Sequence, residues 1–388
     1  MGAETKDMTG QFALTPEQKA VQELAIAFAQ ERIAPFAIRW DQEKHFPLEL
    51  FKDSARLGLG GICVSEDVGG SNLGRLEAVL IYDGLARACP CTAGYFSVHN
   101  MVATMIDRFG TEEQRKKWLP AMCGFELLGA YCLSEPGTGS DASMLSTRAM
   151  PHNDTYVLNG VKQFISGAGA ADIYIVMART GAEGARGVSA FVVEKGTEGL
   201  SFGPSEKKMG WNAQPTRQVV LQNVTVPRSH LLSAEGTGFK LAMSALDGGR
   251  LNIAACSLGG ARSALDKAKL YMGERHAFGK RLTDFQALQF RLADMATDLE
   301  VAQTFLWRAA AALEAKEANA TTLCAMAKRF VTDAGFRIAD QALQLLGGYG
   351  YLTEYGIEKI VRDLRVHQIL EGTNEIMRVI IARNLIPA

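Results

Sequence analysis

Leu282-Thr-Asp-Phe-Gln-Ala-Leu-Gln-Phe-Arg-Leu-Ala-Asp-Met-Ala-Thr-Asp-Leu-Glu300 repeats apolar side chains at three- and four-residue intervals. This spacing places the apolar side chains on one face of an α-helix, whereas a strand alternates with a period of two. Gly238–Met272 and Thr322–Leu346 show the same pattern. Proline breaks helix interiors, and no proline occurs between Arg228 and Ile386. The sequence therefore predicts a C-terminal domain of long helices over residues 236–388.

The N-terminal part of the sequence is also predicted to be helical. Thr15-Pro16-Glu17-Gln18 combines an N-cap residue, a proline at the first helical position and a capping-box glutamine. Further helices are expected at Leu48–Leu57, Arg75–Ala86, Asn100–Phe109 and Glu112–Leu119. We therefore expect a disordered leader over residues 1–10 and an N-terminal helical domain over residues 11–126.

The middle of the chain differs, because short apolar or β-branched runs are punctuated there by Gly, Pro, Asn and Asp. Such runs are typical of strands, and they occur at Leu127–Leu133, Thr155–Leu158, Val161–Ile165, Ile173–Arg179, Val188–Val193 and Gln218–Val224. Asn159-Gly160 separates two of them and predicts a hairpin. We expect a β-barrel or sandwich over residues 127–235, in a protein that is otherwise mainly α.

The near-zero net charge limits the classes of function. The chain carries 41 basic and 42 acidic side chains, for a net charge of −1, which argues against binding to nucleic acid or to a membrane surface. No apolar run reaches the ~18 residues that span a bilayer. The seven cysteines are scattered, as in a reducing compartment. Because the N-terminus shows no secretory or transit signal, we expect a bacterial cytoplasm, or the mitochondrial matrix for a processed eukaryotic chain.

Several familiar cofactor and nucleophile motifs are missing from the sequence. No Gly-x-Gly-x-x-Gly follows a strand, and there is no Gly-x-Ser-x-Gly. Gly273–Lys280 approaches a phosphate-binding loop but has one residue too many between its glycines, and Arg281 replaces the required Ser or Thr. The six histidines are dispersed, so no metal site is expected.

Glu371 lies between two helical patterns, Ile357–Gln368 and Asn374–Leu385, and follows Ile369 and Leu370. Apolar surroundings raise the pKa of a carboxyl group, which can act as a base once water is excluded. The Gly that follows permits a sharp turn, and the next residue, Thr373, is a suitable N-cap. By itself the motif also fits a charged linker residue beside a helix start.

Three other polar segments contain glycine and are candidates to hold a cofactor or substrate. Tyr131–Asp141 leaves a strand with hydroxyls and a flexible backbone, which can offer N–H groups to a ring carbonyl or a phosphate. Phe164–Gly169 pairs an aromatic ring with a hydroxyl after another strand. Asp247 and Arg250 stand three residues apart on one face of a helical tract. Each segment alone also fits a turn or an intrahelical ion pair.

Taken together, these segments resemble the acyl-CoA dehydrogenase family of flavoenzymes. The resemblance runs from about Leu14 to Leu385 and includes the helical, β and helical order of domains. It is carried by Tyr131–Asp141, Phe164–Gly169, Asp247–Arg250, Arg275–Gly279, Gln344–Gly348 and Glu371–Ile376. It implies a four-helix bundle in the C-terminal domain, an FAD cofactor between that bundle and the β-domain, and an acyl-CoA substrate.

The resemblance also implies which residues bind FAD. Those near the isoalloxazine ring are Tyr131, Leu133, Ser134, Gly139, Ser140, Phe164, Ile165 and Ser166, although many relatives carry Trp and Thr where this chain has Phe164 and Ser166. The residues expected at the pyrophosphate and adenosine are Arg275, Phe278, Phe285 and Gln286. Gln344, Leu345, Gly347 and Gly348 are expected to reach an FAD held mainly by a neighbouring subunit. Thr373, Asn374 and Glu375 complete the set.

For the chemistry, the resemblance implies α,β-dehydrogenation with Glu371 as the base that removes the α-proton of the thioester while a β-hydride passes to the flavin. Substrate contacts are expected from Ser140, Asp247, Gly248, Gly249, Arg250 and Arg383. Some relatives carry the base on the Asp-x-x-Arg helix, directly before the Arg. This chain has Gly249 at that position, so the role falls to Glu371.

The acyl group is expected to be short and branched. Phe164–Thr180, Gly210–Arg217, Leu246–Gly260 and Arg365–Arg378 are most similar to the branch of the family that converts isobutyryl-CoA to methacrylyl-CoA in valine degradation. The resemblance further implies a homotetramer that passes electrons to electron-transferring flavoprotein. The alternatives are another short- or branched-chain dehydrogenase, an acyl-CoA oxidase, or a non-catalytic relative that binds nucleic acid, which the charge balance and Glu371 disfavour.

Overall fold

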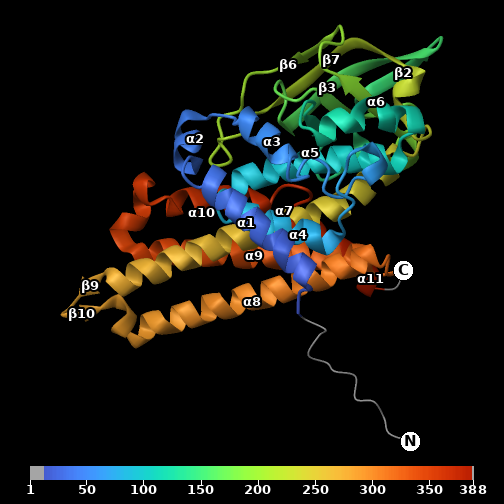
Figure 1. Cartoon of the computed structure of the whole chain (residues 1–388). Coiled ribbons are helices and arrows are strands. Elements are labelled where there is room, and N and C mark those ends of the chain that lie inside the picture. The colour runs from blue at the N-terminus through green and yellow to red at the C-terminus, as the bar shows by residue number, and fades with distance from the viewer. Residues whose placement is uncertain (1–12, 387–388) are drawn as a thin grey trace, which may run out of the picture.

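The computed structural model describes residues 13–386, which run through helices, a sheet and then long helices (Figure 1). The expectation of a mainly α protein with a central β-domain is confirmed. The sheet and the ribbon β9–β10 lie at opposite ends of the molecule (Figure 1). The leader expected over residues 1–10 lies outside the described residues.

Helices α1 to α6 build the N-terminal region. They are α1 (Pro16–Arg32), α2 (Ala37–Glu43), α3 (Leu48–Ala55), α4 (Arg75–Ala86), α5 (Pro90–Phe109) and α6 (Glu112–Cys123). α1 starts as predicted, because the Gln18 N–H donates to the Thr15 hydroxyl at 3.2 Å and the Gln18 side chain accepts from the Thr15 N–H at 3.0 Å. The predicted start of α5 at Asn100 was wrong. The helix begins at Pro90, where a proline lacks only an N–H that would be unpaired anyway.

The strands form one connected sheet in the middle region. They are β1 (Gly129–Cys132), β2 (Arg148–His152), β3 (Thr155–Ser166), β4 (Ile173–Arg179), β5 (Val188–Glu194), β6 (Leu200–Phe202), β7 (Thr216–Pro227) and β8 (Leu231–Leu232). Their order is β6-β7-β3-β2-β4-β5-β8, with β1 paired to β4. β2 and β4 meet at the pair Arg148↔Arg179, which joins the two halves of the sheet.

The hairpin predicted at Asn159-Gly160 does not form, because β3 runs through this pair. Its pairing with β7 shifts register at this point, so the dipeptide marks an irregularity within a strand. The turn lies instead at Asn153, which has a left-handed φ of 52° and joins β2 to β3. β2 itself was missed because Pro151 disfavours a strand. This residue lies beyond the pair that links β2 to β4 and therefore loses no ladder hydrogen bond there.

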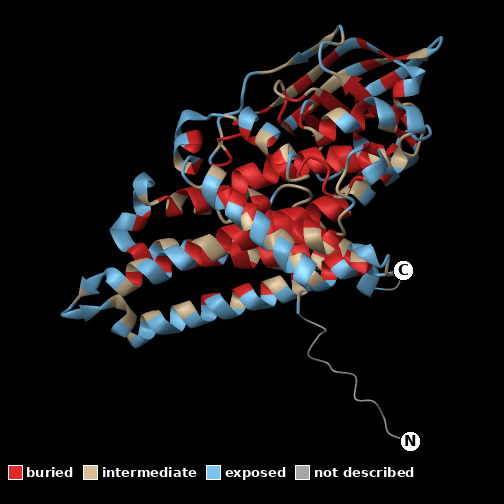
Figure 2. Ribbon diagram, viewed as in Figure 1, coloured by how far each residue is buried: buried red, intermediate tan, exposed pale blue. Residues whose placement is uncertain are grey.

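Long helices form the C-terminal region. They are α7 (Gly238–Glu274), α8 (Gln286–Glu314) and α9 (Ala320–Leu346), followed by the shorter α10 (Ile357–His367) and α11 (Asn374–Leu385). The ribbon β9 (His276–Ala277) and β10 (Lys280–Arg281) joins α7 to α8. α7 packs on α9, α8, α4 and α5, and burial is concentrated where these helices meet (Figure 2). None of the described helices is long and apolar enough to cross a membrane.

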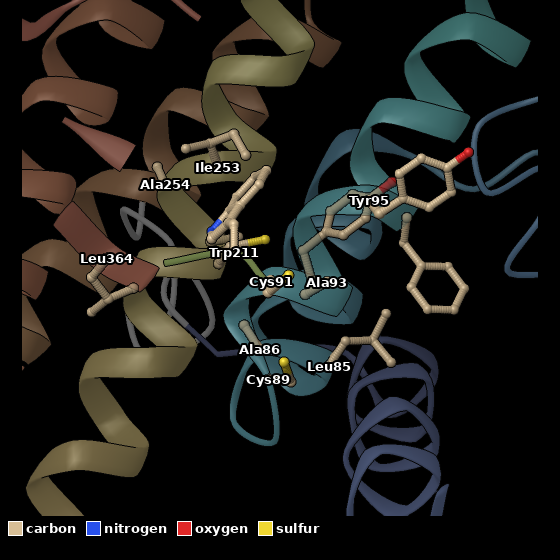
Figure 3. Close-up of a cluster of buried hydrophobic side chains, with 14 of the residues drawn as sticks. Leu85, Ala86, Cys89, Cys91, Ala93, Tyr95, Trp211, Ile253, Ala254 and Leu364 are labelled. Atoms are coloured by element: carbon tan, nitrogen blue, oxygen red, sulfur yellow. The ribbon is translucent and has the colours of Figure 1, made fainter. Parts of the chain in front are cut away.

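Trp211 connects the β-region to the helices around the site. Its backbone N–H donates to Asp363 Oδ1 at 2.6 Å and its indole N–H donates to His367 Nε2 at 3.1 Å. A Cβ at Gly94 of α5 would lie 2.4 Å from the indole, so this glycine lets the ring pack between α5 and α10 (Figure 3). Trp211 therefore holds the end of α10, which leads into the Glu371 segment, at two of its residues.

We expect Gly160→Ala to destabilise the protein because a Cβ would lie 2.4 Å from Thr147 Oγ1 and the φ of 153° disfavours a side chain. Overpacking of about 1–3 kcal/mol adds to strain of similar size. In the control Gly196→Ala the φ is 87° and the surroundings within residues 13–386 are open, so strain of about 1–2 kcal/mol remains. Urea unfolding measures both, and equal losses would contradict the close packing at Gly160.

Candidate active site

The loop between α10 and α11 carries Glu371 and is held from inside the bundle by Lys328 of α9. Glu371 has a left-handed φ of 55° and Gly372 a φ of 93°. The Lys328 ammonium donates to the Gly372 carbonyl at 2.8 Å and to Asn374 Oδ1 at 2.9 Å. Thr373 caps α11 as predicted, accepting from the Ile376 N–H at 3.3 Å. A non-glycine residue with positive φ is strained, so the loop needs these anchors.

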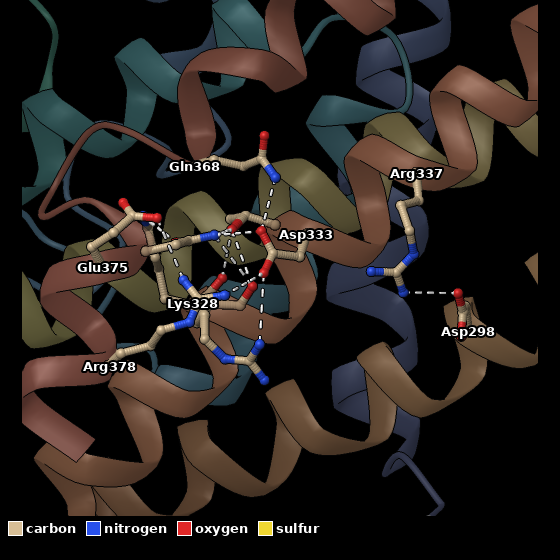
Figure 4. A network of polar contacts seen from close by, with 10 residues as sticks. Asp298, Lys328, Asp333, Arg337, Gln368, Glu375 and Arg378 are labelled. Carbon is tan, nitrogen blue, oxygen red and sulfur yellow. Dashed lines mark hydrogen bonds and ion pairs between the residues drawn. The ribbon is translucent and has the colours of Figure 1, made fainter. Parts of the chain in front are cut away.

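Asn374 takes part in this anchoring rather than facing outward as expected of a cofactor ligand. Its amide nitrogen donates to Asp333 Oδ1 at 2.7 Å and to Thr332 Oγ1 at 3.0 Å. Gln368 donates to the same Asp333 oxygen at 2.8 Å (Figure 4). The neighbouring Glu375 points to solvent and lies 3.6 Å from Arg378. The direct contact with FAD expected of Asn374 therefore has no free side-chain group to make it.

The carboxyl group of Glu371 lies against the backbone of α7 at Gly249. A Cβ at Gly249 would be 2.3 Å from Glu371 Oε2 and 3.0 Å from its Cδ. On the same helix, Arg250 Nε donates to the Glu371 carbonyl at 3.3 Å. The two positions at which the family resemblance allows a base are thus in contact, and the absence of a side chain at 249 is what makes room for Glu371.

Burial dominates the electrostatics of Glu371. It raises the pKa of the carboxyl group to about 7, although the charges of Lys328 and Arg250 lower it. Oε2 is buried and has no hydrogen-bond partner within residues 13–386. The pKa of Lys328 falls to about 8 because of burial, against the raising effect of Glu371. A carboxyl group whose pKa lies near neutral pH, and whose oxygen has no hydrogen-bond partner, is suited to taking up a proton.

The expected substrate-binding pair on α7 is tightly engaged within the protein. Arg250 Nη1 donates to Asp247 Oδ1 at 2.8 Å, and the Thr321 hydroxyl donates to Asp247 Oδ2 at 2.7 Å. The intrahelical ion pair that their spacing also allows is present, and it orients the guanidinium that holds the Glu371 carbonyl. Arg383 is exposed near the end of α11 and belongs to none of the ion pairs found in the described chain. The structure therefore does not bring Arg383 to this pair.

The predicted ring-binding loop of the β-region begins beside Glu371. The buried Tyr131 hydroxyl has no hydrogen-bond partner in the described part of the chain, and burial, then the Glu371 charge, raise its pKa. Leu133 is buried, and the Ser134 carbonyl accepts from the Gln163 N–H at 2.8 Å. Ser140 is exposed further along the loop.

The loop's position depends on a buried ion pair that the sequence analysis missed. Lys162 Nζ lies 2.8 Å from Glu135 Oε1 and also donates to the Leu133 carbonyl at 3.1 Å. Glu135 in turn accepts from the backbone N–H groups of Ser146 and Thr147. The first half of the 131–141 segment is therefore tied to the sheet, and no spacing in the sequence indicates this pairing.

Phe164 and its neighbours present an open aromatic ring at the end of β3. The Phe164 side chain is 67% exposed and its φ is 60°, whereas Ile165 is buried. Ser166 accepts a long contact of 3.4 Å from Gln214. A strained backbone and an exposed aromatic ring both cost free energy unless a ligand or a partner covers the ring. This segment is therefore suited to binding a planar group.

The remaining predicted cofactor residues form a second cluster at the far end of the helices. Arg275, Gln344, Leu345, Gly347 and Gly348 line one groove, together with Tyr349 and other residues. The predicted residues Phe278, Phe285 and Gln286 lie in and after the β9–β10 ribbon, and Phe278 is 95% exposed. At ~1.5 Å per residue, about 37 Å of α7 separates Gly249 from the helix end before Arg275. One chain does not bring the two clusters together.

The residues of the two clusters fit two different parts of an FAD. Around the first cluster, the unpaired hydroxyl of Tyr131 and the exposed ring of Phe164 are polar and aromatic groups that lack partners within residues 13–386. A Cβ at Gly139 or Gly347 meets open space, as far as the described residues are concerned. Residues 13–386 contain no group of three or more His, Cys, Asp or Glu side chains that could hold a metal ion.

Three family models match the chain in order. They are the N-terminal domain of acyl-CoA dehydrogenase at residues 15–126, the middle domain at residues 130–224 and the C-terminal domain at residues 236–386. The chain therefore belongs to the acyl-CoA dehydrogenase family. Members of this family are FAD flavoproteins, and the protein is an oxidoreductase.

Individual proteins of known name or structure are similar to this chain over almost its whole length. The chain is 52% identical over 373 residues to the mitochondrial isobutyryl-CoA dehydrogenase of Dictyostelium discoideum, covering 96% of this chain and 90% of that one. Butyryl-CoA dehydrogenase from Megasphaera elsdenii has a TM-score of 0.94 at 39% identity, with 96% and 99% of the two chains covered. A chain solved in work on the electron transferring flavoprotein of Acidaminococcus fermentans has a TM-score of 0.95 at 38% identity, with 97% and 100% covered.

We expect Gly249→Ala to impair turnover of acyl-CoA. The new methyl group would lie only 2.3 Å from Glu371 Oε2 and would therefore push the carboxylate out of its position. Displacement by an ångström can cost about 10²-fold in rate. The control is Gly273→Ala, on the same helix but in open space within the described residues, where alanine adds up to about 1 kcal/mol of helix stability. Steady-state kinetics and thermal melting of both variants test this. Unimpaired turnover in Gly249→Ala would show that the contact is not needed.

Proposed function

We propose that the protein catalyses FAD-dependent α,β-dehydrogenation of a short branched acyl-CoA, converting isobutyryl-CoA to methacrylyl-CoA, with Glu371 as the base. The observation that carries this proposal is the Glu371 carboxyl group, which lies against Gly249. Its Oε2 is buried without a hydrogen-bond partner among the described residues, and its pKa is raised to about 7. The similarity to an isobutyryl-CoA dehydrogenase supports the choice of acyl group.

Proton removal falls to Glu371 Oε2. In the carboxylate form this oxygen takes the α-proton of the thioester, and the low-dielectric surroundings that raise its pKa also favour the neutral product of that transfer. The negative charge that develops on the thioester oxygen needs hydrogen-bond donors. The Glu371 backbone N–H is suited to this, because it donates none of the backbone hydrogen bonds found in residues 13–386.

The cofactor would be held by the two clusters described above. Tyr131, Leu133, Ser134 and Phe164 would line the ring, and Arg275 with Gln344–Gly348 would hold the remainder. FAD, when bound, supplies the acceptor for the hydride that leaves the β-carbon. The protein's own part is to bring the thioester between the ring-binding loop and Glu371 and to exclude water from that space.

A cavity beside Gly249 supports a short acyl group. It is lined mainly by residues of α4, α5 and α7. Its lining includes Ala245, Met101 and Tyr82. The nearby Phe96 and Tyr95 side chains of α5 are fully buried in an aromatic cluster with Phe51. They therefore support the packing of α5 and do not line this cavity.

We also propose that the protein works as a homotetramer that passes electrons to an electron-transferring flavoprotein. The assembly is supported by the separation of the two cofactor clusters along α7, because a neighbouring copy would supply the missing cluster. The electron partner is supported by the similarity to a chain solved in work on such a flavoprotein. Turnover in air without added acceptor would instead favour an acyl-CoA oxidase.

Glu371→Gln should leave the yellow flavin colour and acyl-CoA binding intact while lowering kcat by roughly 10²–10⁴-fold, the usual contribution of a general base. In the wild type, the base must be ionised, so kcat/KM should fall as pH drops below about 7, the pKa of Glu371. Absorbance spectra and a pH–rate profile measure these effects.

Glu183→Gln, in an exposed loop, provides the control and should behave as the wild type. If Glu371→Gln keeps an unchanged kcat, another residue is the base. If the purified protein is colourless and cannot be reconstituted with FAD, the cofactor assignment fails.

Among short acyl-CoAs, isobutyryl-CoA should show the highest kcat/KM. Isovaleryl-CoA has one methylene more, and butyryl-CoA carries the methyl group of the branch at the end of a straight chain instead. A pocket distinguishes a change of one carbon by ~1–3 kcal/mol, so both should react with kcat/KM lower by about tenfold or more. Steady-state assays with an artificial electron acceptor compare the three directly. A higher kcat/KM for either competitor would contradict the isobutyryl-CoA assignment.

A further inference from the structure

Arg75 is a buried cation that lines the cavity and forms no ion pair within residues 13–386. It is 8% exposed, its Nε has no hydrogen-bond partner, and it takes part in none of the ion pairs found within residues 13–386. Its backbone N–H donates to Glu314 Oε2 at 2.9 Å, which fixes the start of α4. Burying an unpaired charge costs several kcal/mol, so a role in folding does not explain this side chain.

The guanidinium of Arg75 reaches the part of α7 that carries the site. A Cβ at Gly248 would lie 2.8 Å from Arg75 Nη1 and 3.1 Å from its Cζ. The next residue, Gly249, holds the Glu371 carboxyl group in the same way. Gly248 thus leaves room for the Arg75 guanidinium, and the neighbouring Gly249 leaves room for the carboxyl group of Glu371, the proposed base. Both Arg75 and Gly249 line the cavity.

Other polar groups share this wall of the cavity. Arg108 of α5 also lines it, and burial and then the nearby Arg75 lower the pKa of Arg108. Asn252 of α7 lines it too, and its Oδ1 is buried without a hydrogen-bond partner in the described chain. The cavity therefore has apolar side chains on one part of its surface and unsatisfied polar groups on another.

We propose that Arg75 sets the upper limit on acyl-chain length, as the charged wall of the acyl cavity. This inference rests on the proposed dehydrogenation. A branched four-carbon acyl group leaves space in which water can solvate the guanidinium. A longer apolar chain must fill that space and desolvate an unpaired charge, which is unfavourable. Selection thus comes from a penalty on the wrong substrate as well as from contacts with the right one.

The test is Arg75→Met, which removes the charge and keeps an unbranched side chain of similar length. The ratio of kcat/KM for hexanoyl-CoA to that for isobutyryl-CoA should rise by about tenfold or more. Arg75→Lys retains the charge and should keep the wild-type ratio. Arg308→Met removes an exposed arginine, paired with Glu317 on the surface, and should also keep it. Thermal melting should show no loss of stability in Arg75→Met, because the lost charge had no partner.

Two results would overturn the inference. The first is an unchanged ratio in a folded, yellow Arg75→Met variant. The second is a wild-type preference for glutaryl-CoA over pentanoyl-CoA that Arg75→Met abolishes, because Arg75 would then be a carboxylate-binding residue. If the wild type does not oxidise isobutyryl-CoA, the proposed function fails instead. Dissociation constants for the same acyl-CoAs, from changes in the flavin spectrum, would still measure the length limit.

Discussion

The ammonium group of Lys328 holds the loop that carries Glu371 in place, and much of the candidate site depends on it. It binds the Gly372 carbonyl and the Asn374 side chain, and so fixes the two residues that follow Glu371 in the chain. The same charge lowers the pKa of Glu371 against the raising effect of burial. One buried cation therefore sets both the position of the carboxyl group and the balance that leaves its pKa near 7. Positive φ at Glu371 persists because the surroundings over-determine it.

The small residues of α7 are the second requirement. Gly248 and Gly249 admit Arg75 and Glu371, and Gly259 and Gly260 admit the backbone of α4 and the side chain of Leu364. Without side chains at these positions, α7 can lie close to several neighbours at once, although glycine weakens a helix by ~1 kcal/mol per residue. Helix propensity is given up locally, and tertiary packing on four other helices compensates for it.

The sequence predicted those features that depend on neighbours in the chain. The Thr15 cap, the bounds of α4, the Asp247–Arg250 pair and the Thr373 cap all follow from spacings of three or four residues and were confirmed. Features that depend on distant residues were not predictable in this way. Asn159-Gly160 has the composition of a turn, yet the packing of Thr147 against Gly160 keeps β3 continuous. Lys328 lies in an alanine-rich helix, and Arg75 is the first residue of α4, where a polar residue is common. Nothing near them in the sequence indicates what their side chains contact, so only the fold shows it.

The contact between Glu371 and Gly249 also constrains how such a site can change over generations. A carboxylate introduced at 249 would collide with the one already at 371, and losing the one at 371 first would remove the proposed base. On the proposed mechanism, neither single step keeps a working site. A move of the base from the loop to the helix would therefore need two coupled substitutions.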